Sequence, residues 1–285
     1  MSDSTARTFK IERLNTHNGP GFRTVIFFKG CPLHCTWCHN PEGISARKQV
    51  WFHGAKCIGC QSCIDICPID ALTMDPLGIN IDRMLCTGCY KCIDVCPSKA
   101  LSQLGEDLTV DDLMQIILKD KGYFDSSWGG ITVTGGEPGI YADFIADLFK
   151  RCRENGVQTA FDTSGAVPLH QLEHVLKKTD LLFLDLKIID KERSKTYTGL
   201  DINAVMRSIN WLKSFMLSNS NSPRLTIRTP LIPELTDTDS NLESIAKIIK
   251  DLGEELVECW ELCEFNLFWV NSPLLAASLI LKWGN

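Results

Sequence analysis

The chain has few of the features that would place it among disordered, fibrous or nucleic-acid-binding proteins. Only 12 prolines occur in 285 residues, and 44% of the residues are hydrophobic against 22% charged, which excludes disordered and collagen-like chains. Basic residues form no run longer than a pair and the formal net charge is -6, so the chain lacks the positive surface that nucleic acid requires. We therefore expect a folded globular protein with small-molecule or protein partners.

No segment is suited to a signal peptide or a membrane-spanning helix. Residues 1–10 are polar and mixed in charge, without the apolar stretch of a secretory signal. Residues 267–281 are nearly uncharged, but they contain Pro273 and number only 15, whereas a membrane-spanning helix needs about 20 apolar residues. The sequence therefore predicts a cytoplasmic protein without membrane contact, and we expect a monomer.

Cysteine, in contrast, is abundant and unevenly placed. Eight of the 14 cysteines lie between Cys57 and Cys96. Because thiols stay reduced in the cytoplasm, this density indicates metal ligands rather than disulfides. Cys152, Cys259 and Cys263 stand outside any ligand spacing, and we expect them to be buried thiols that pack as small hydrophobic side chains.

The dense cysteine segment is an internal repeat. CIGCQSCIDICPIDAL from Cys57 and CTGCYKCIDVCPSKAL from Cys86 share ten identities in sixteen positions. Each half has the spacing CxxCxxCxxxCP, which resembles bacterial ferredoxins with two four-iron clusters, where the fourth cysteine binds the other cluster. Zinc knuckles or disulfides are the alternatives. The predicted ligand sets are Cys57, Cys60, Cys63 and Cys96 for one cluster, and Cys86, Cys89, Cys92 and Cys67 for the other.

The rest of the chain alternates between strand-like and helix-like segments. The expected strands are 24–28, 131–134, 158–161, 181–186, 225–231 and 256–262, and the expected helices are 110–118, 143–154, 169–177, 204–215 and 242–252. This order predicts an α/β fold with parallel strands, either a partial (β/α)6 barrel or a doubly wound sheet. The repeat interrupts it as an inserted α+β ferredoxin-like module over 51–104, between an N-terminal part, 1–50, and the remainder, 105–285.

A second cysteine motif directly follows the first expected strand. Cys31, Cys35 and Cys38 have the spacing CxxxCxxC. Three ligands on a four-iron cluster leave one iron open to a substrate or cofactor, whereas a zinc site or three buried thiols are the alternatives. With Trp37 before the last cysteine, the segment resembles the radical S-adenosylmethionine (SAM) enzymes. In that family the reduced cluster cleaves SAM to methionine and a 5′-deoxyadenosyl radical.

Motifs at the ends of later strands are similar to the same family. TGGEP at 134–138 resembles its GGEP segment, which implies that the two glycine backbones and the Glu137 carboxylate hold the SAM ammonium; a tight turn is the alternative. Carboxylates at the carboxyl ends of parallel strands point into the active-site mouth, although structural ion pairs would also suit Asp162, Asp185 and Lys187. The SAM contacts that the resemblance implies are Thr36, Trp37, Cys38, Gly135, Gly136, Glu137, Asp185, Leu186, Lys187, Arg228 and Asn266.

The resemblance narrows to the activating enzymes of glycyl radical enzymes. HNGPGFR at 17–23, KGCPLHCTWCHNPEG from Lys29, DTSG at 162–165 and DLK at 185–187 are similar to that subfamily. It implies that Lys187 and Arg228 neutralise the SAM carboxylate and that a flavodoxin or ferredoxin supplies electrons. The implied ligands of a monovalent cation are Asp162, Thr163, Phe183 and Asp185, and the implied contacts of the partner's glycine loop are Asn18, Gly19, Pro20 and Gly21.

Two positions depart from the subfamily. Asn18 stands where an aspartate is usual, which bears on partner docking rather than on cluster chemistry. From about Leu267 the tail turns apolar where the subfamily continues into a polar helix, which affects the closing of the barrel and the adenosine contact of Asn266.

The resulting hypothesis is an oxidoreductase that uses SAM and three four-iron clusters to form a glycyl radical on a partner enzyme. One alternative is a radical SAM enzyme that acts on a small molecule or on another protein residue. A second is a multi-cluster electron-transfer protein without bond chemistry, in which GGEP and DLK would have no reason to stand at strand ends.

Overall fold

The computed structural model describes residues 4–253 and 255–264 and divides into two compact units. The larger unit consists of the chain up to Ile44 and from Asp107 onward, and the smaller is Ser45–Glu106. Asn266 and the apolar tail from about Leu267 lie outside the described residues. Within the described ranges no helix combines the length and the hydropathy needed to cross a bilayer.

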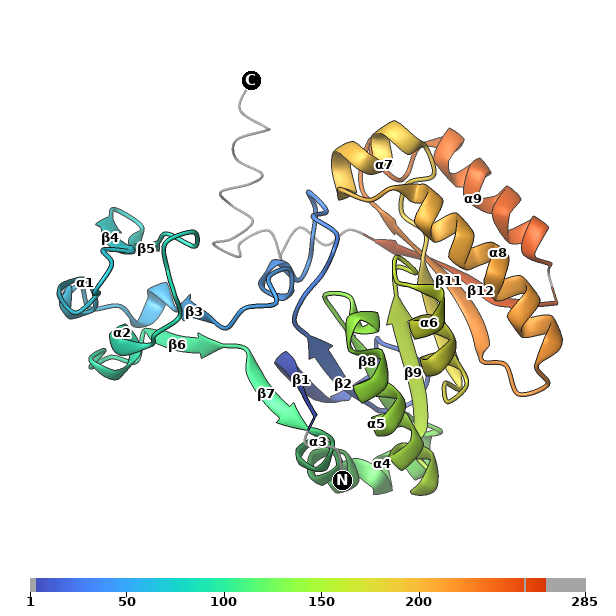
Figure 1. Ribbon diagram of the computed structural model, residues 1–285, viewed down its shortest axis with the longest axis horizontal. Coiled ribbons are helices and arrows are strands. Elements are labelled where there is room, and N and C mark those ends of the chain that lie inside the picture. Colours follow the sequence, from blue (N-terminus) through green and yellow to red (C-terminus); the bar gives the residue numbers. More distant parts are fainter. Residues whose placement is uncertain (1–3, 254, 265–285) are drawn as a thin grey trace. The chain divides into compact units, whose positions relative to one another are not determined.

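The larger unit is built on an eight-stranded sheet (Figure 1). Its strands are β1 Thr5–Asn15, β2 Arg23–Phe28, β7 Glu106–Thr109, β8 Gly130–Gly135, β9 Gln158–Thr163, β10 Leu181–Asp185, β11 Arg224–Leu231 and β12 Val257–Glu264. Their order in the sheet is β12-β11-β10-β9-β8-β2-β1-β7. Strands β2 and β8 to β12 pair in parallel, and β1 pairs antiparallel with β2. The six parallel strands coincide with the six predicted ones, so the α/β class with a mostly parallel sheet is confirmed.

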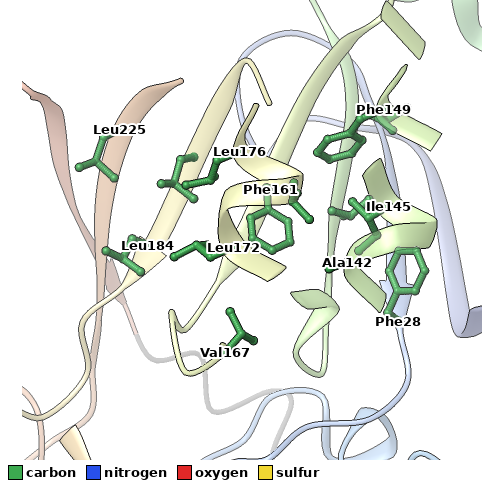
Figure 2. Packing of buried hydrophobic residues seen from close by; sticks show 14 of the residues in the cluster. Phe28, Ala142, Ile145, Phe149, Phe161, Val167, Leu172, Leu176, Leu184 and Leu225 are labelled. Atoms are coloured by element: carbon green, nitrogen blue, oxygen red, sulfur yellow. The ribbon is translucent and has the colours of Figure 1, made fainter. Parts of the chain in front are cut away.

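Helices connect the parallel strands and cover the sheet. Their bounds are α3 Val110–Ile117, α4 Lys121–Ser127, α5 Ala142–Glu154, α6 Leu169–Leu176, α7 Lys191–Thr198, α8 Ile202–Ser218 and α9 Asp239–Leu252. Figure 2 shows Phe161 and Leu184 from the strands packed with Ile145, Phe149 and Leu172 from the helices. These residues belong to one hydrophobic core that the strands and helices share. Burying each large apolar side chain stabilises the fold by about 1.5–3 kcal/mol.

The sequence did not predict β1, α4 or α7, because none carries a clear apolar period. Helix α7, KERSKTYT, is polar on all sides. Its ends are fixed instead by capping, since the Asp190 side chain accepts from the Arg193 N–H at 2.8 Å and Gly199 ends the helix with φ +72°. Strand β1 is half polar and has one neighbour antiparallel to it, so its residues alternate less regularly between core and solvent.

The smaller unit repeats its backbone as well as its sequence. Its elements are β3 Gln49–Phe52, α1 Ser62–Asp65, β4 Leu72–Asp75, β5 Gly78–Ile81, α2 Lys91–Asp94 and β6 Leu101–Leu104. β3 pairs antiparallel with β6, and β4 with β5. Gly59 and Gly88, at equivalent positions of the two halves, both have φ +70°, and Gln61 and Tyr90, before α1 and α2, have φ +60° and +64°. The two halves therefore share one local fold.

Adding a methyl group at Gly129 is expected to destabilise the larger unit. A Cβ at this position would lie 1.9 Å from the Phe22 carbonyl oxygen, a backbone atom that cannot swing away. We expect Gly129→Ala to lower the free energy of unfolding by about 3 kcal/mol, measured by urea denaturation. Gly122→Ala in α4 is the matched control, because nothing lies within 4 Å of its Cβ and alanine favours a helix by about 1 kcal/mol. Equal stability of the two variants would contradict the close packing.

Candidate active site at the carboxyl ends of the parallel strands

A cavity of about 260 Å³ opens at the carboxyl ends of the parallel strands. The last residues of β8, β9 and β10 line it together with the loop that follows β2. Its lining includes Cys31, Cys35, Trp37, Cys38, Gly135, Gly136, Asp162, Thr163, Ser164, Asp185, Lys187, Arg228 and Cys263. Ligands of α/β proteins bind outside the carboxyl ends of the strands, so this cavity is the candidate site.

Backbone hydrogen bonds hold the loop that carries the three cysteines. The Cys31 N–H donates to the Ile44 carbonyl oxygen at 2.9 Å, and the Thr36 N–H donates to that of Tyr197 at 2.9 Å. Trp37 is buried in a small apolar cluster beside the cavity. The loop thus directs its cysteines to the cavity, whereas Thr36, a predicted SAM contact, is not among the lining residues.

The three cysteines of this loop are partly buried and line one cavity, a donor set that suits a cluster with three protein ligands. Burial raises the pKa of Cys31 and of Cys38 to about 12, and it raises that of Cys35 against the opposing effect of the Lys187 ammonium. Free thiols here are protonated at neutral pH, and ligation must displace the protons. Among the described residues no three His, Cys, Asp or Glu converge tightly enough for a single metal ion; ligands of a four-iron cluster stand further apart, because the cluster is wider.

Two glycines bring the end of β8 against the cysteine loop. A Cβ on Gly135 would lie 2.6 Å from backbone atoms of Phe28, and one on Gly136 would lie 2.2 Å from the Gly30 carbonyl oxygen. Neither position admits a side chain. Both glycines line the cavity, where bare backbone can approach a ligand closely.

Glu137, the next residue, is directed away from the cavity. It is 1% exposed and is not a lining residue. Its Oε1 accepts from Thr163 Oγ1 at 2.7 Å and from the Gly139 N–H at 3.0 Å, and its Oε2 accepts from the Ser164 N–H at 2.9 Å and from Ser164 Oγ at 2.6 Å. In this arrangement Glu137 fixes the loop after β9. Its contact with the SAM ammonium stays a prediction.

Two cations at the cavity pair with carboxylates. Lys187 forms an ion pair with Asp185. The Arg228 Nε donates to Glu261 Oε2 at 2.7 Å, and its Nη1 lies 3.5 Å from Asp162 Oδ2. Burial alone would lower the pKa of Lys187, but the neighbouring Asp185 carboxylate raises it above its usual value. Both cations therefore keep their charge at neutral pH.

An aromatic ring supports one of these cations. The guanidinium of Arg228 lies over the Phe183 ring, 3.6 Å from its centre. Such stacking is worth about 1–2 kcal/mol away from water, and it fixes the plane of the guanidinium. Leu186, a predicted SAM contact, is fully buried, and its N–H donates to the Arg228 carbonyl oxygen at 2.8 Å. These contacts tie the DLK segment to β11.

Asp162 is difficult to ionise in this cavity. Burial, followed by the neighbouring Asp185 carboxylate, raises the pKa of Asp162 from 3.8 to about 6, against the opposing effect of Arg228. Because the pKa of Asp162 is higher in the folded than in the unfolded state, the protonated carboxyl favours folding. This contribution to the free energy of unfolding is fully present below about pH 4 and is lost as the pH rises through about 6.

Replacing Asp162 with asparagine is expected to remove this pH dependence. A shift of about two pKa units corresponds to about 3 kcal/mol, so D162N should gain up to that amount relative to the wild type as the pH rises from 4 to 7.5. Urea denaturation of the cluster-free proteins across this range measures the difference. Asp147→Asn, on the exposed side of α5, is the matched control. A D162N difference that stays constant with pH would refute the raised pKa.

The HNGPG segment precedes β2, and none of its residues lines the cavity. A Cβ on Gly19 would lie 3.2 Å from the Phe183 ring, the ring on which the guanidinium of Arg228 stacks. The Thr132 hydroxyl donates to the Asn18 carbonyl oxygen at 2.6 Å, and the buried Arg23 donates from Nη1 to the Pro20 carbonyl oxygen at 3.2 Å. The structure therefore does not bring the predicted partner contacts, Asn18, Gly19, Pro20 and Gly21, to the cavity.

Sequence reasoning missed Ser164, Glu261 and Cys263. Cys152 is buried as predicted, but Cys259 and Cys263 are exposed, so the prediction of buried thiols was wrong for these two. They alternate with Glu261 along β12, which is the strand at the end of the described sheet. The spacing of two residues was a signal for one shared face.

Two small cavities in the smaller unit each meet four cysteines. Cys57, Cys60, Cys63 and Cys96 line one, and Cys67, Cys86, Cys89 and Cys92 line the other. In both, the fourth cysteine comes from the opposite half of the repeat. The structure thus groups the eight cysteines as the repeat spacing predicted.

Comparisons with known proteins agree with this geometry. Residues 25–249 match the family model described as the radical SAM superfamily. The (2S)-3-sulfopropanediol dehydratase activating enzyme of Klebsiella oxytoca is 38% identical over 254 residues, which are 87% of this chain and 78% of the relative. The trans-4-hydroxy-L-proline dehydratase activating enzyme of Clostridioides difficile and the indoleacetate decarboxylase activating enzyme of Tractidigestivibacter scatoligenes are each 37% identical, over 85% of this chain and 78% of the relative.

Proposed function

The chain belongs to the radical SAM superfamily, and from that premise we propose that it is an activating enzyme that forms a glycyl radical on a partner enzyme. The observation that carries the proposal is the 37–38% identity to activating enzymes over 85–87% of the chain. When bound, the four-iron cluster supplies the electron that splits SAM into methionine and a 5′-deoxyadenosyl radical, which takes a hydrogen atom from the α-carbon of a glycine.

Cys31, Cys35 and Cys38 would hold the cluster at the cavity. Their loop is fixed by backbone hydrogen bonds at Cys31 and Thr36, so the three thiols are oriented before the cluster is assembled. Three ligands leave one iron for the amino and carboxylate groups of SAM. Trp37 is buried beside them and shields this part of the cavity from water.

The charges around the cavity support a monovalent cation as part of the site. The ion-paired group has three carboxylates and two cations and therefore a net charge of −1. Its members are Asp162, Asp185, Glu261, Lys187 and Arg228. A cation held by Asp162 and Asp185, with Thr163 and the Phe183 backbone, would balance it. The same cation would lower the pKa of Asp162 by favouring its charged form.

Binding of the cation would also make the positive side chains of Lys187 and Arg228 available to SAM. Lys187 and Arg228 already pair with carboxylates, so neither is available to a new anion without an exchange of partners. Once a cation neutralises Asp162 and Asp185, both side chains can turn their charge to the SAM carboxylate. Binding of cation and SAM is then mutually favourable.

The smaller unit serves as the electron-transfer part of the proposal. Its two sets of four cysteines would hold two further four-iron clusters in a ferredoxin-like module. A reduced flavodoxin or ferredoxin would supply one electron for each SAM cleaved. Cluster assembly needs free thiols, which supports a location in the reducing cytoplasm.

The partner is a protein with an accessible glycine loop. Asn18, Gly19, Pro20 and Gly21 remain the proposed contacts of that loop. None of them lines the cavity, but Gly19 lies against the Phe183 ring on which Arg228 stacks, so we propose that they hold the partner's loop beside the cavity in which its glycine reacts.

Anaerobic reconstitution tests the proposal in two stages. The dithionite-reduced protein should convert SAM to 5′-deoxyadenosine, detected by chromatography, and failure to do so would exclude a radical SAM reaction. Addition of a candidate glycyl radical enzyme should then give a doublet in its electron paramagnetic resonance (EPR) spectrum. A partner variant with alanine in place of the reacting glycine is the control and should give no doublet.

A further inference from the structure

The two halves of the cysteine repeat differ at one position beside the fourth cysteine. In one half the order is Cys67-Pro68-Ile69, and in the other it is Cys96-Pro97-Ser98. Their backbones agree closely, since Asp70 and Lys99, the next residues of the two halves, both have φ +52°. The repeat is therefore a natural comparison of a hydroxyl with an apolar side chain in one local fold.

The hydroxyl lies next to a ligand sulfur. The Ser98 Oγ is 3.7 Å from the Cys96 Sγ, within hydrogen-bonding distance for sulfur. One backbone donor is common to both halves, because the N–H groups of Ala71 and Ala100 each donate to the fourth cysteine of their half at 3.3 Å. Cys96 thus has a side-chain hydroxyl beside it, whereas the equivalent residue beside Cys67 is Ile69, whose side chain has no donor.

A thiolate bound to iron has no proton, so the Ser98 hydroxyl must be the donor once a cluster is present. The reduced cluster carries one more negative charge than the oxidised cluster, and a donor to its sulfur stabilises the reduced form more. Hydrogen bonds to the sulfurs are among the factors that set the reduction potential of iron–sulfur clusters.

We propose that Ser98 raises the reduction potential of the cluster held by Cys57, Cys60, Cys63 and Cys96. The inference rests on the proposed function, which places a cluster on these ligands. The step is a one-electron reduction of the cluster core from 2+ to 1+ by the reduced flavodoxin or ferredoxin, and no ligand or proton changes place. Ser98 acts on the charge of this cluster through the Cys96 sulfur.

Other side chains differ between the two cavities, so each cluster is compared with its own variants. Thr87, Tyr90 and Lys91 line the cavity of the second set, where Ile58 and Gln61 line that of the first. Lys91 is exposed, and water and salt screen its charge. Replacing Ser98 alone leaves all of these contributions unchanged.

A potentiometric titration followed by EPR tests the proposal in the full-length chain. Cys31, Cys35 and Cys38 are replaced by alanine, so that the only clusters observed are those of the smaller unit. Ser98→Ala should lower one midpoint, with a threefold to tenfold smaller ratio of reduced to oxidised cluster at a fixed potential; tenfold corresponds to about 59 mV for one electron. Ser98→Thr keeps the hydroxyl and should retain the original midpoint.

The repeat supplies the reciprocal variant. Ile69→Ser places a hydroxyl beside Cys67, and it should raise the midpoint of the other cluster while leaving the first unchanged. Ile69→Ser tests the effect of the hydroxyl on the midpoint even if Ser98→Ala binds no cluster at its own site. Unchanged midpoints in Ser98→Ala and Ile69→Ser, with iron content equal to that of the parent, would overturn the role of Ser98. Absence of both clusters in the parent would instead refute the ferredoxin-like part of the proposed function.

Discussion

Replacing Cys35 with alanine is expected to reduce SAM cleavage below detection, a loss of roughly a thousandfold or more, because the cofactor carries the difficult chemistry. Cys35 is one of three cysteines at the cavity, and two remaining ligands cannot hold a four-iron cluster firmly. Deoxyadenosine formation by the reduced protein measures the activity, and bound iron should fall by about one third if three clusters are present.

Cys259→Ser is the matched control for this variant. Cys259 is likewise a free cysteine of the larger unit, but it stands outside the CxxxCxxC motif and does not line the cavity. We expect full SAM cleavage and unchanged iron content. Activity of Cys35→Ala near the wild-type level would show that the reactive cluster is bound elsewhere.

Glu137→Gln is expected to destabilise the larger unit by about 3 kcal/mol and to impair SAM cleavage strongly. The Glu137 carboxylate accepts four hydrogen bonds from Gly139, Thr163 and Ser164, two on each oxygen. Glutamine keeps only one acceptor oxygen, so the backbone N–H that faces its NH₂ group loses its partner. Hydrogen bonds to a buried charged group are worth about 1.5–3 kcal/mol each, and a buried donor left unpaired adds its own cost.

Urea denaturation and deoxyadenosine formation together test the role of Glu137. A loss of stability accompanied by a raised KM for SAM would show that the carboxylate positions the Thr163-Ser164 loop. Glu154→Gln, at the exposed end of α5, is the matched control and should match the wild type in both measurements. If Glu137→Gln keeps its stability and loses only SAM binding, the carboxylate contacts SAM directly, as the sequence motif implied.

The fold followed from the sequence wherever the core imposed a regular period. The runs at 131–134 and 181–186 are rich in β-branched or apolar residues because they lie inside the parallel sheet, and their register with neighbouring strands places the polar residues at the strand ends along one edge. Helix α7 and strand β1 escaped prediction because local capping and strand pairing, rather than burial, determine them.

The sequence predicted several of the residues that line the cavity, but it did not predict the contacts between them. The spacing of Cys31, Cys35 and Cys38 identifies a shared loop, and Asp162 and Asp185 follow from their places at strand ends. The direction of the Glu137 carboxylate depends on Thr163 and Ser164, more than twenty-five residues later, and no local pattern shows it. Glu261 likewise enters the site only through the pairing of β12 with β11.

The antiparallel pair of β3 and β6 bears on how the smaller unit is attached. Gln49 lies opposite Leu104, so the chain enters and leaves Ser45–Glu106 through adjacent strands about 5 Å apart. A segment with neighbouring ends can be gained, lost or exchanged as a cassette while the flanking chain needs only a short turn to close the gap. The smaller unit, and with it the proposed clusters and their electron donor, can therefore change or be lost during evolution without a change in the sheet that carries the cavity.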